Sequence, residues 1–167
     1  MCAGKSTVGP RLALRLGWDF VDLDQDIERT QGKSIAEIFE RDGETNFRAL
    51  ETAAIKALHE RLECVVALGG GAFTQEDNRN LVHHLGISVF LDCPLKEILN
   101  RCPPDGTRPL FKTQEQIRQL YERRLPQYRE SQLQVGASNL EPDDIVSSIV
   151  EKLSQFHPFE DAKEEKE

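Results

Sequence analysis

The sequence has no excess of positive charge: Asp and Glu outnumber Lys and Arg by 29 to 21, which leaves a formal net charge of -8. Proteins that bind nucleic acid or anionic membranes broadly need a basic field, so the composition argues against both kinds of partner. A phosphorylated ligand would have to be held by a few local cations.

The chain also lacks an 18-residue apolar run and the hydrophobic segment of a signal peptide, which predicts a cytoplasmic location. An upstream segment could still have carried a targeting signal. The four cysteines, Cys2, Cys64, Cys93 and Cys102, show no C-x-x-C spacing. We therefore expect reduced thiols, with no zinc site and no disulfide.

The length of 167 residues suits one domain with a real core, which we place at residues 1–153. The remaining residues, 154–167, are polar and acidic and are expected to form a disordered tail.

Apolar periodicity, capping signals and β-branched runs predict alternating strands and helices. Helices are expected at 6–16, 34–42, 44–62, 76–85, 94–102, 113–131 (interrupted or kinked at Pro126) and 143–153, and strands at 18–24, 64–68, 87–92 and 133–137. This order indicates βαβ units and a parallel sheet with helices on both faces. Because ligands of such sheets bind at the carboxyl ends of the strands, the polar features found there are expected to converge.

The opening residues MCAGKST match the second half of a phosphate-binding loop, G-x-x-x-x-G-K-[ST]. The first glycine of that pattern would fall two residues before Met1. Either the chain is a shortened copy of a nucleotide-binding protein or the match is accidental. The helix expected to follow favours the first reading, because helix N-termini bind phosphates.

Asp22 and Asp24 are predicted to end one strand and, two residues apart, to share a face. The alternative is a solvated strand end or the N-cap of the next helix. Gly69, Gly70 and Gly71 follow another strand and suit close approach of the main chain to a ligand, although a tight turn would also explain them.

Phosphoryl transfer requires charge neutralisation, and Arg48, Arg108 and Arg124 are the candidate cations. The alternative for each is a surface salt bridge to one of the 29 acids.

Together these motifs resemble the shikimate kinase family. The pattern begins at Arg48, Glu51 and Ile55 and continues through VVALGGGAF at 65–73. AGKSTVG, FVDLDQDIE, IAEIFERDGETNFR, TRPLF and the R-x-P-x-Y of Arg124 to Tyr128 extend the resemblance from Met1 to about Leu153.

The resemblance implies a P-loop kinase fold, a five-stranded parallel sheet flanked by helices, with a mobile lid near 103–113. It implies a monomer that phosphorylates the 3-hydroxyl of shikimate with ATP and Mg²⁺ in aromatic amino-acid biosynthesis. The implied ATP-binding residues are Cys2, Ala3, Gly4, Lys5, Ser6, Thr7, Arg101 and Arg108, with Ser6 and Asp22 at the metal. The implied substrate residues are Asp24, Arg48, Gly69, Gly70, Gly71 and Arg124, and the implied catalytic residues are Lys5, Asp24 and Arg108.

The sequence departs from the family pattern at its start, where the central strand that leads into the P-loop is missing. Met1 is therefore expected to be an internal residue of a longer protein or the result of a cut, and two strand edges are expected to be unpaired in the core. Leu140 stands where some members carry an arginine on the adenine side. The alternatives are another small-molecule kinase, such as a gluconate-type kinase, and a non-catalytic relative that only binds.

Overall fold

The computed structural model describes residues 2–102 and 113–156. The expected helix after the P-loop is present as α1 (Lys5–Leu16), and the predicted stop is confirmed: Gly17 adopts the left-handed conformation and donates its N–H to the carbonyls of Ala13 and Leu14. Val8 and Leu12 bury one face of this helix.

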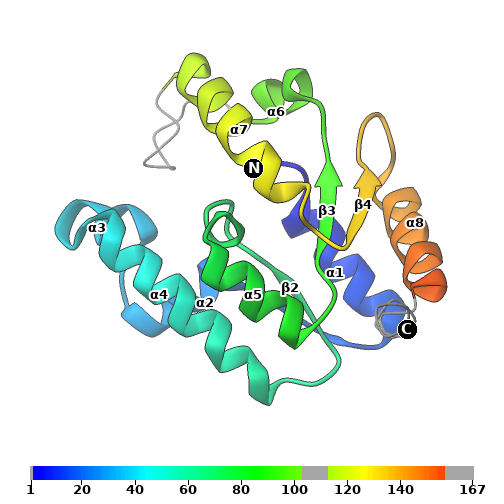
Figure 1. Ribbon diagram of the computed structural model, residues 1–167, viewed down its shortest axis with the longest axis horizontal. Helices are drawn as coiled ribbons and strands as arrows, with labels where there is room; N and C mark the ends of the chain where they lie inside the picture. Colours follow the sequence, from blue (N-terminus) through cyan, green and yellow to red (C-terminus); the bar gives the residue numbers. More distant parts are fainter. Residues whose placement is uncertain (1, 103–112, 157–167) are drawn as a thin grey trace, which may run out of the picture.

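The first half of the chain continues into a helical region seen at the left of Figure 1. It comprises β1 (Asp19–Asp22), α2 (Leu23–Gln31), α3 (Ile35–Arg41) and α4 (Gly43–Ala57). The predicted capping box of α3 is confirmed, because Ser34 and Glu37 each bond the other's backbone N–H. The second long helix is shorter than predicted: α4 ends at Ala57 and a 3₁₀ turn, η1 (Leu58–Glu60), follows.

The second half supplies the remaining strands and the helices that cover them. Its elements are β2 (Cys64–Ala67), η2 (Ala72–Thr74), α5 (Glu76–Leu85), β3 (Val89–Asp92), α6 (Leu95–Arg101), α7 (Gln114–Tyr128), β4 (Leu133–Gly136) and α8 (Pro142–Gln155). Helix α7 runs through Pro126, so of the interruption or kink predicted at that residue the interruption is wrong.

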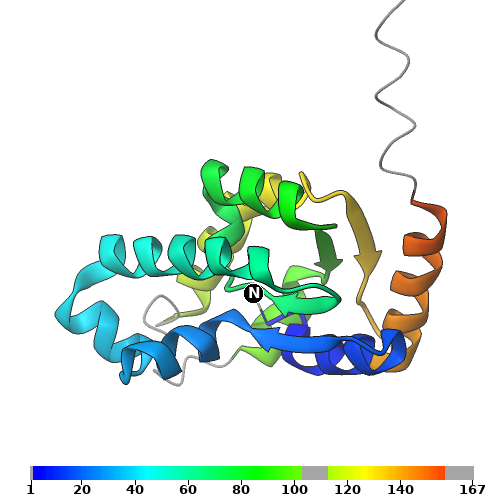
Figure 2. The same cartoon turned by 90° about the horizontal axis from the view of Figure 1, so that it is seen from below.

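The strands within the described residues form two separate parallel pairs instead of one five-stranded sheet. β1 pairs with β2, and β3 pairs with β4. Between the pairs lies an apolar cavity of about 510 Å³, lined by β2, β3 and one face each of α1 and α8. The separation of the two pairs is visible in Figure 2. The α/β architecture is as predicted, and the expectation of unpaired strand edges is confirmed at β2 and β3, which do not pair with each other.

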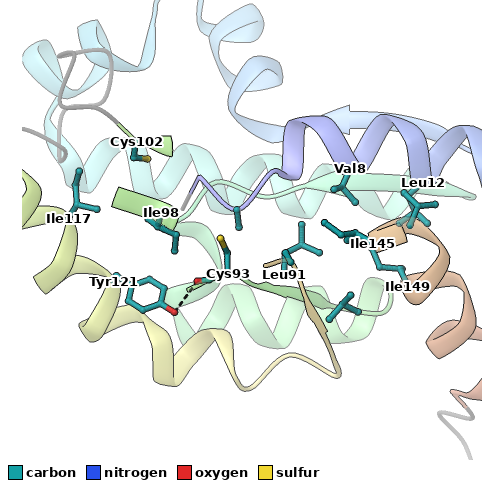
Figure 3. Packing of buried hydrophobic residues seen from close by; sticks show 14 of the residues in the cluster. Val8, Leu12, Leu91, Cys93, Ile98, Cys102, Ile117, Tyr121, Ile145 and Ile149 are labelled. Atoms are coloured by element: carbon teal, nitrogen blue, oxygen red, sulfur yellow. Dashed lines mark hydrogen bonds between the residues drawn. The ribbon is translucent and has the colours of Figure 1, made fainter. Parts of the chain in front are cut away.

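The larger hydrophobic core lies beside β3 and β4 and is built from α1, α6, α7 and α8 (Figure 3). Leu91, Ile98, Ile117 and Ile149 are almost fully buried there. A second core around Leu23 joins α2, α3 and α4. Within 2–102 and 113–156, no helix has the length and apolar character that a membrane crossing requires.

The predicted pairing of Asp22 and Asp24 on one strand is wrong in detail. β1 ends at Asp22, which is the N-cap of α2, and Asp24 lies in the first turn of that helix. The reason is local, because the Asp22 carboxylate accepts hydrogen bonds from the backbone N–H groups of Asp24 and Gln25.

The expectation of four free thiols is also wrong. Cys2 and Cys102 form a disulfide with their Cα atoms 6.0 Å apart, whereas Cys64 and Cys93 are free. The pair is 100 residues apart in sequence, so its proximity depends on how the P-loop packs against the end of α6. Arg108, most of the expected lid and the tail from residue 157 lie outside the described residues.

Candidate active site

A pocket of about 540 Å³ lies at the carboxyl ends of β1 and β2. Apart from Arg108, which lies outside the described residues, every site residue expected from the sequence lines it. These are Cys2, Ala3, Gly4, Lys5, Ser6, Thr7, Asp22, Asp24, Arg48, Gly69, Gly70, Gly71, Arg101 and Arg124. Residues from six separate parts of the chain therefore face one hollow.

One wall of the pocket is the start of α1. Gly4 is its N-cap in the left-handed conformation, with φ 91°, and its carbonyl accepts from the N–H groups of Thr7 and Val8. The N-terminal peptide groups of this helix, which carry partial positive charge, lie at the pocket. This end of α1 therefore has the polarity that suits an anion, and Lys5 beside it adds a cation.

The chemistry of a magnesium site is present next to this wall. The Ser6 hydroxyl donates to Asp22 Oδ2 at 3.2 Å, and Asp22 Oδ1 accepts from the Asp24 N–H at 3.1 Å. Mg²⁺ in phosphate-binding sites takes one or two protein oxygens and completes its shell with water and phosphate oxygens. The hydroxyl and carboxylate of Ser6 and Asp22 fit that requirement.

The opposite wall is anchored by a buried ion pair. Arg48 Nη1 lies 2.6 Å from Glu51 Oε2, and its Nη2 lies 2.8 Å from Glu44 Oε1. The Glu51 side chain is only 1% exposed, and burial raises its pKa, while the Arg48 charge opposes that rise. The nearby Asp24 charge raises the pKa further. Glu51 thus holds the Arg48 guanidinium in place at the pocket.

The glycines after β2 are required by close approach. A Cβ at Gly69 would lie 2.6 Å from Asp24 Oδ1, and a Cβ at Gly71 would collide with the Arg48 guanidinium. Any larger residue would displace the charged groups, so the glycines keep Asp24 and Arg48 against the loop. The alternative of a tight turn is also correct, because Gly70 and Gly71 lie in a turn in which the Ala72 N–H donates to the Gly69 carbonyl at 3.2 Å.

Arg124 reaches the same pocket from α7 and is 7% exposed. Burial lowers its pKa, and the positive charge of Arg48 lowers it further. Two guanidinium groups whose charges repel each other in a partly buried pocket have the chemistry that suits a carboxylate. The alternative of a salt bridge holds in part for Arg48, which pairs with the half-exposed Glu44 as well as with the buried Glu51. Arg124 is buried, so a surface salt bridge does not describe it.

Arg101 differs from those two. Its side chain is exposed at the pocket edge, and its Nη2 pairs with Glu97 Oε2 at 2.7 Å along α6. The next residue, Cys102, is joined to Cys2 of the P-loop. The disulfide therefore ties the end of α6 to the phosphate-binding wall.

Sequence reasoning did not single out Glu28, Ile35, Phe39 or Phe47, which also line the pocket, nor two residues that hold its groups in place. Glu51 and Tyr128 were interpreted only as members of the family pattern. In the structure the Arg48 guanidinium donates to the Glu51 carboxylate, and the Tyr128 hydroxyl donates to the Gly70 carbonyl. Their spacing was the available signal: Glu51 is three residues after Arg48 and Tyr128 four after Arg124, so each can share a helix face with its arginine.

One wall of the pocket is the P-loop, beside which lie the Ser6 and Asp22 oxygens that suit a metal ion. The Asp24 carboxylate and the guanidinium groups of Arg48 and Arg124 line the same pocket. This combination defines a small-molecule kinase of the P-loop class. The family model "Shikimate kinase" matches residues 1–154, and the chain belongs to the shikimate kinase family.

Relatives and solved structures agree with that assignment. The chain is 43% identical to a shikimate kinase of Ruegeria pomeroyi over 89% of this chain and 80% of the relative. It is 37% identical to one of Persephonella marina, over 92% and 94%. A structure titled "Shikimate kinase from Acinetobacter baumannii in complex with shikimate" superposes with a TM-score of 0.88 at 38% identity, over 93% of this chain and 89% of that one. The Aquifex aeolicus enzyme gives 0.84 at 36% identity, with 92% of each chain covered.

Proposed function

We propose that this chain transfers the terminal phosphoryl group of ATP to the 3-hydroxyl of shikimate, giving shikimate 3-phosphate and ADP in aromatic amino-acid biosynthesis. The observation that carries the proposal is the single pocket in which the P-loop wall faces Asp24, Arg48 and Arg124. A phosphate donor and a hydroxy acid can occupy it together.

The donor half is formed by residues 2–7. Their backbone N–H groups and Lys5 bind the phosphates, while Ser6 and Asp22 hold Mg²⁺. The ion, when bound, neutralises charge on the phosphate oxygens. Arg101 lies beside the adenine, and Arg108 completes the donor site by stabilising the transferred group.

The acceptor half is formed by Asp24, the two buried arginines and the glycine loop. Arg48 and Arg124 bind the shikimate carboxylate, and a backbone group at Gly70 contacts the ring substituents. With the carboxylate held at that end, the hydroxyls lie toward Asp24 and the P-loop wall. Asp24 orients the attacking hydroxyl and accepts its proton.

A coupled ADP-release assay with ATP, Mg²⁺ and shikimate tests the proposal. We expect turnover that requires shikimate and is absent with gluconate, which carries a carboxylate and hydroxyls without the ring. Turnover with gluconate alone would identify a gluconate-type kinase instead.

The second candidate kept from the sequence is a non-catalytic relative that binds shikimate. The same assay on this chain and on one extended by a strand ending in Gly-Phe before Met1 separates the two. Shikimate binding without turnover in either protein would establish the second candidate. The monomeric state and cytoplasmic location stay predictions from the sequence.

A further inference from the structure

Tyr128, at the end of α7, links two parts of the acceptor half. Its hydroxyl donates to the carbonyl oxygen of Gly70 at 2.6 Å, across 58 residues of sequence. The side chain is 8% exposed, and its ring packs on Phe90 with the centroids 5.5 Å apart. The phenol is thus held against the glycine loop by both its ring and its hydroxyl.

The same phenol faces Arg124, which lies one helical turn earlier on α7. Burial raises the pKa of Tyr128 above its ordinary value of 10.0, and the positive charge of Arg124 opposes that rise. The phenol is therefore protonated and able to donate at neutral pH. One group thus bonds the glycine loop and interacts with the charge of the arginine.

The hydrogen bond to Gly70 has a geometric consequence for the next residue. In a trans peptide the carbonyl of Gly70 and the N–H of Gly71 point in opposite directions. Holding the carbonyl toward Tyr128 directs that N–H away from α7. Gly71 is in turn the residue at which a Cβ would collide with Arg48, so the loop position also determines the room for that arginine.

We propose that Tyr128 is a positioning residue for the substrate carboxylate. It orients Arg124 and the Gly70–Gly71 peptide, so that the arginine and the glycine loop keep a fixed distance from each other. This inference deepens the proposed function and rests on it. Tyr128 acts on the binding of shikimate, because its hydroxyl bonds the glycine loop of the acceptor half.

Tyr121 provides a matched control on the same helix. It is also 8% exposed, and its hydroxyl also donates to a backbone carbonyl, that of Cys93 at 3.3 Å (Figure 3). Its bond lies in the hydrophobic core away from the glycine loop. A purely structural role for these hydroxyls predicts similar behaviour of the two tyrosines.

The experiment compares Tyr128→Phe with Tyr121→Phe in steady-state kinetics, calorimetric titration with shikimate and thermal unfolding. In Tyr128→Phe we expect the KM and the dissociation constant for shikimate to rise about tenfold, because the carbonyl of Gly70 loses its donor. The KM for ATP should stay unchanged. Tyr121→Phe should change neither KM, although both variants should lose similar thermal stability.

Unchanged shikimate binding in Tyr128→Phe, or equal rises in both KM values, would overturn the inference. Because calorimetry does not require turnover, it tests Tyr128 even if the chain is a non-catalytic binder. Absence of shikimate binding in the unsubstituted chain would refute the proposed function and the inference resting on it. Binding that is insensitive to Tyr128→Phe would refute the inference alone.

Discussion

The polar pocket, of about 540 Å³, and the apolar cavity, of about 510 Å³, are similar in size and meet at the end of β2. Both are bordered by Ala67, Leu68, Gly69 and Gly70. In the polar pocket the charged groups are held by ion pairs, a helix cap and close-fitting glycines. In the apolar cavity β2 and β3 face each other without pairing, and Trp18, Leu62, Leu85 and Ile87 are exposed along its lining.

The difference shows that the site does not depend on a continuous sheet. Asp22 is positioned by the cap of α2, Arg48 by Glu51 on α4, and the glycine loop by Tyr128 on α7. Each of these contacts is made by a helix or a loop, so the polar groups converge although the strands are divided. The unpaired strands should instead limit the stability of the whole domain.

The largest expected effect comes from filling the apolar cavity. A chain extended before Met1 by one apolar strand should gain about 5 kcal/mol or more in free energy of unfolding, because several buried backbone groups become paired at about 1 to 3 kcal/mol each. Urea denaturation measures the gain. An extension of equal length with alternate prolines, which cannot pair, is the control, and equal stability of the two extended chains would contradict the interpretation.

The next largest effect concerns the polar pocket alone. Asp24→Asn should reduce kcat by about 10³-fold, because the amide cannot accept the hydroxyl proton. ATP affinity, measured by titration, should be largely retained. Asp26→Asn, two residues later on α2 and paired with Arg29, serves as the control and should keep full turnover. Retained turnover in Asp24→Asn would mean that the proton acceptor is a different group.

A smaller change is expected at the carboxylate clamp. Arg124→Lys should weaken shikimate binding by about 1 to 3 kcal/mol, since an ammonium cannot reproduce the planar two-point contact of a guanidinium. The neighbouring exposed Arg123, changed to Lys, provides the control. Equal shikimate affinity in the two variants by calorimetry would count against the clamp.

The smallest effect is expected at Ser34, which lines neither the polar pocket nor the apolar cavity. Ser34→Ala should cost about 1 kcal/mol of stability through loss of the α3 cap, with shikimate and ATP KM values unchanged. The backbone N–H and then the hydroxyl of Ser34 lower the pKa of Glu37, and Ser34→Ala removes only the contribution of the hydroxyl. That contribution is present above the ordinary carboxyl pKa and is lost as pH falls through the lowered pKa. Urea denaturation at several pH values should therefore show the difference between the two proteins shrinking in acid without vanishing, because the bond from the Glu37 N–H to the Ser34 hydroxyl does not depend on the carboxyl charge; a difference that is constant with pH would contradict this origin.

Local signals predicted much of the fold correctly. Gly17 ends α1, Ser34 and Glu37 begin α3, and the β-branched run at β2 stops at the glycines. The prediction was wrong at Asp24, and it contained no helix over 23–31, where the Asp22 side chain caps α2. At Pro126 the predicted interruption was wrong, because α7 continues through that residue, and tertiary context can override a local preference.

By itself the sequence determined the order of the elements, the P-loop at the head of α1, and the identity of the charged residues, because caps, periodicity and motif spacing act over a few residues. Only the tertiary structure decided that Glu51 is buried on Arg48, that Tyr128 bonds Gly70, that Cys2 meets Cys102 and that the sheet divides. The physical reason is the distance along the sequence over which each effect acts. Burial and most of these contacts depend on distant segments that packing brings together, and the spacing of residues along the chain does not predict which segments meet.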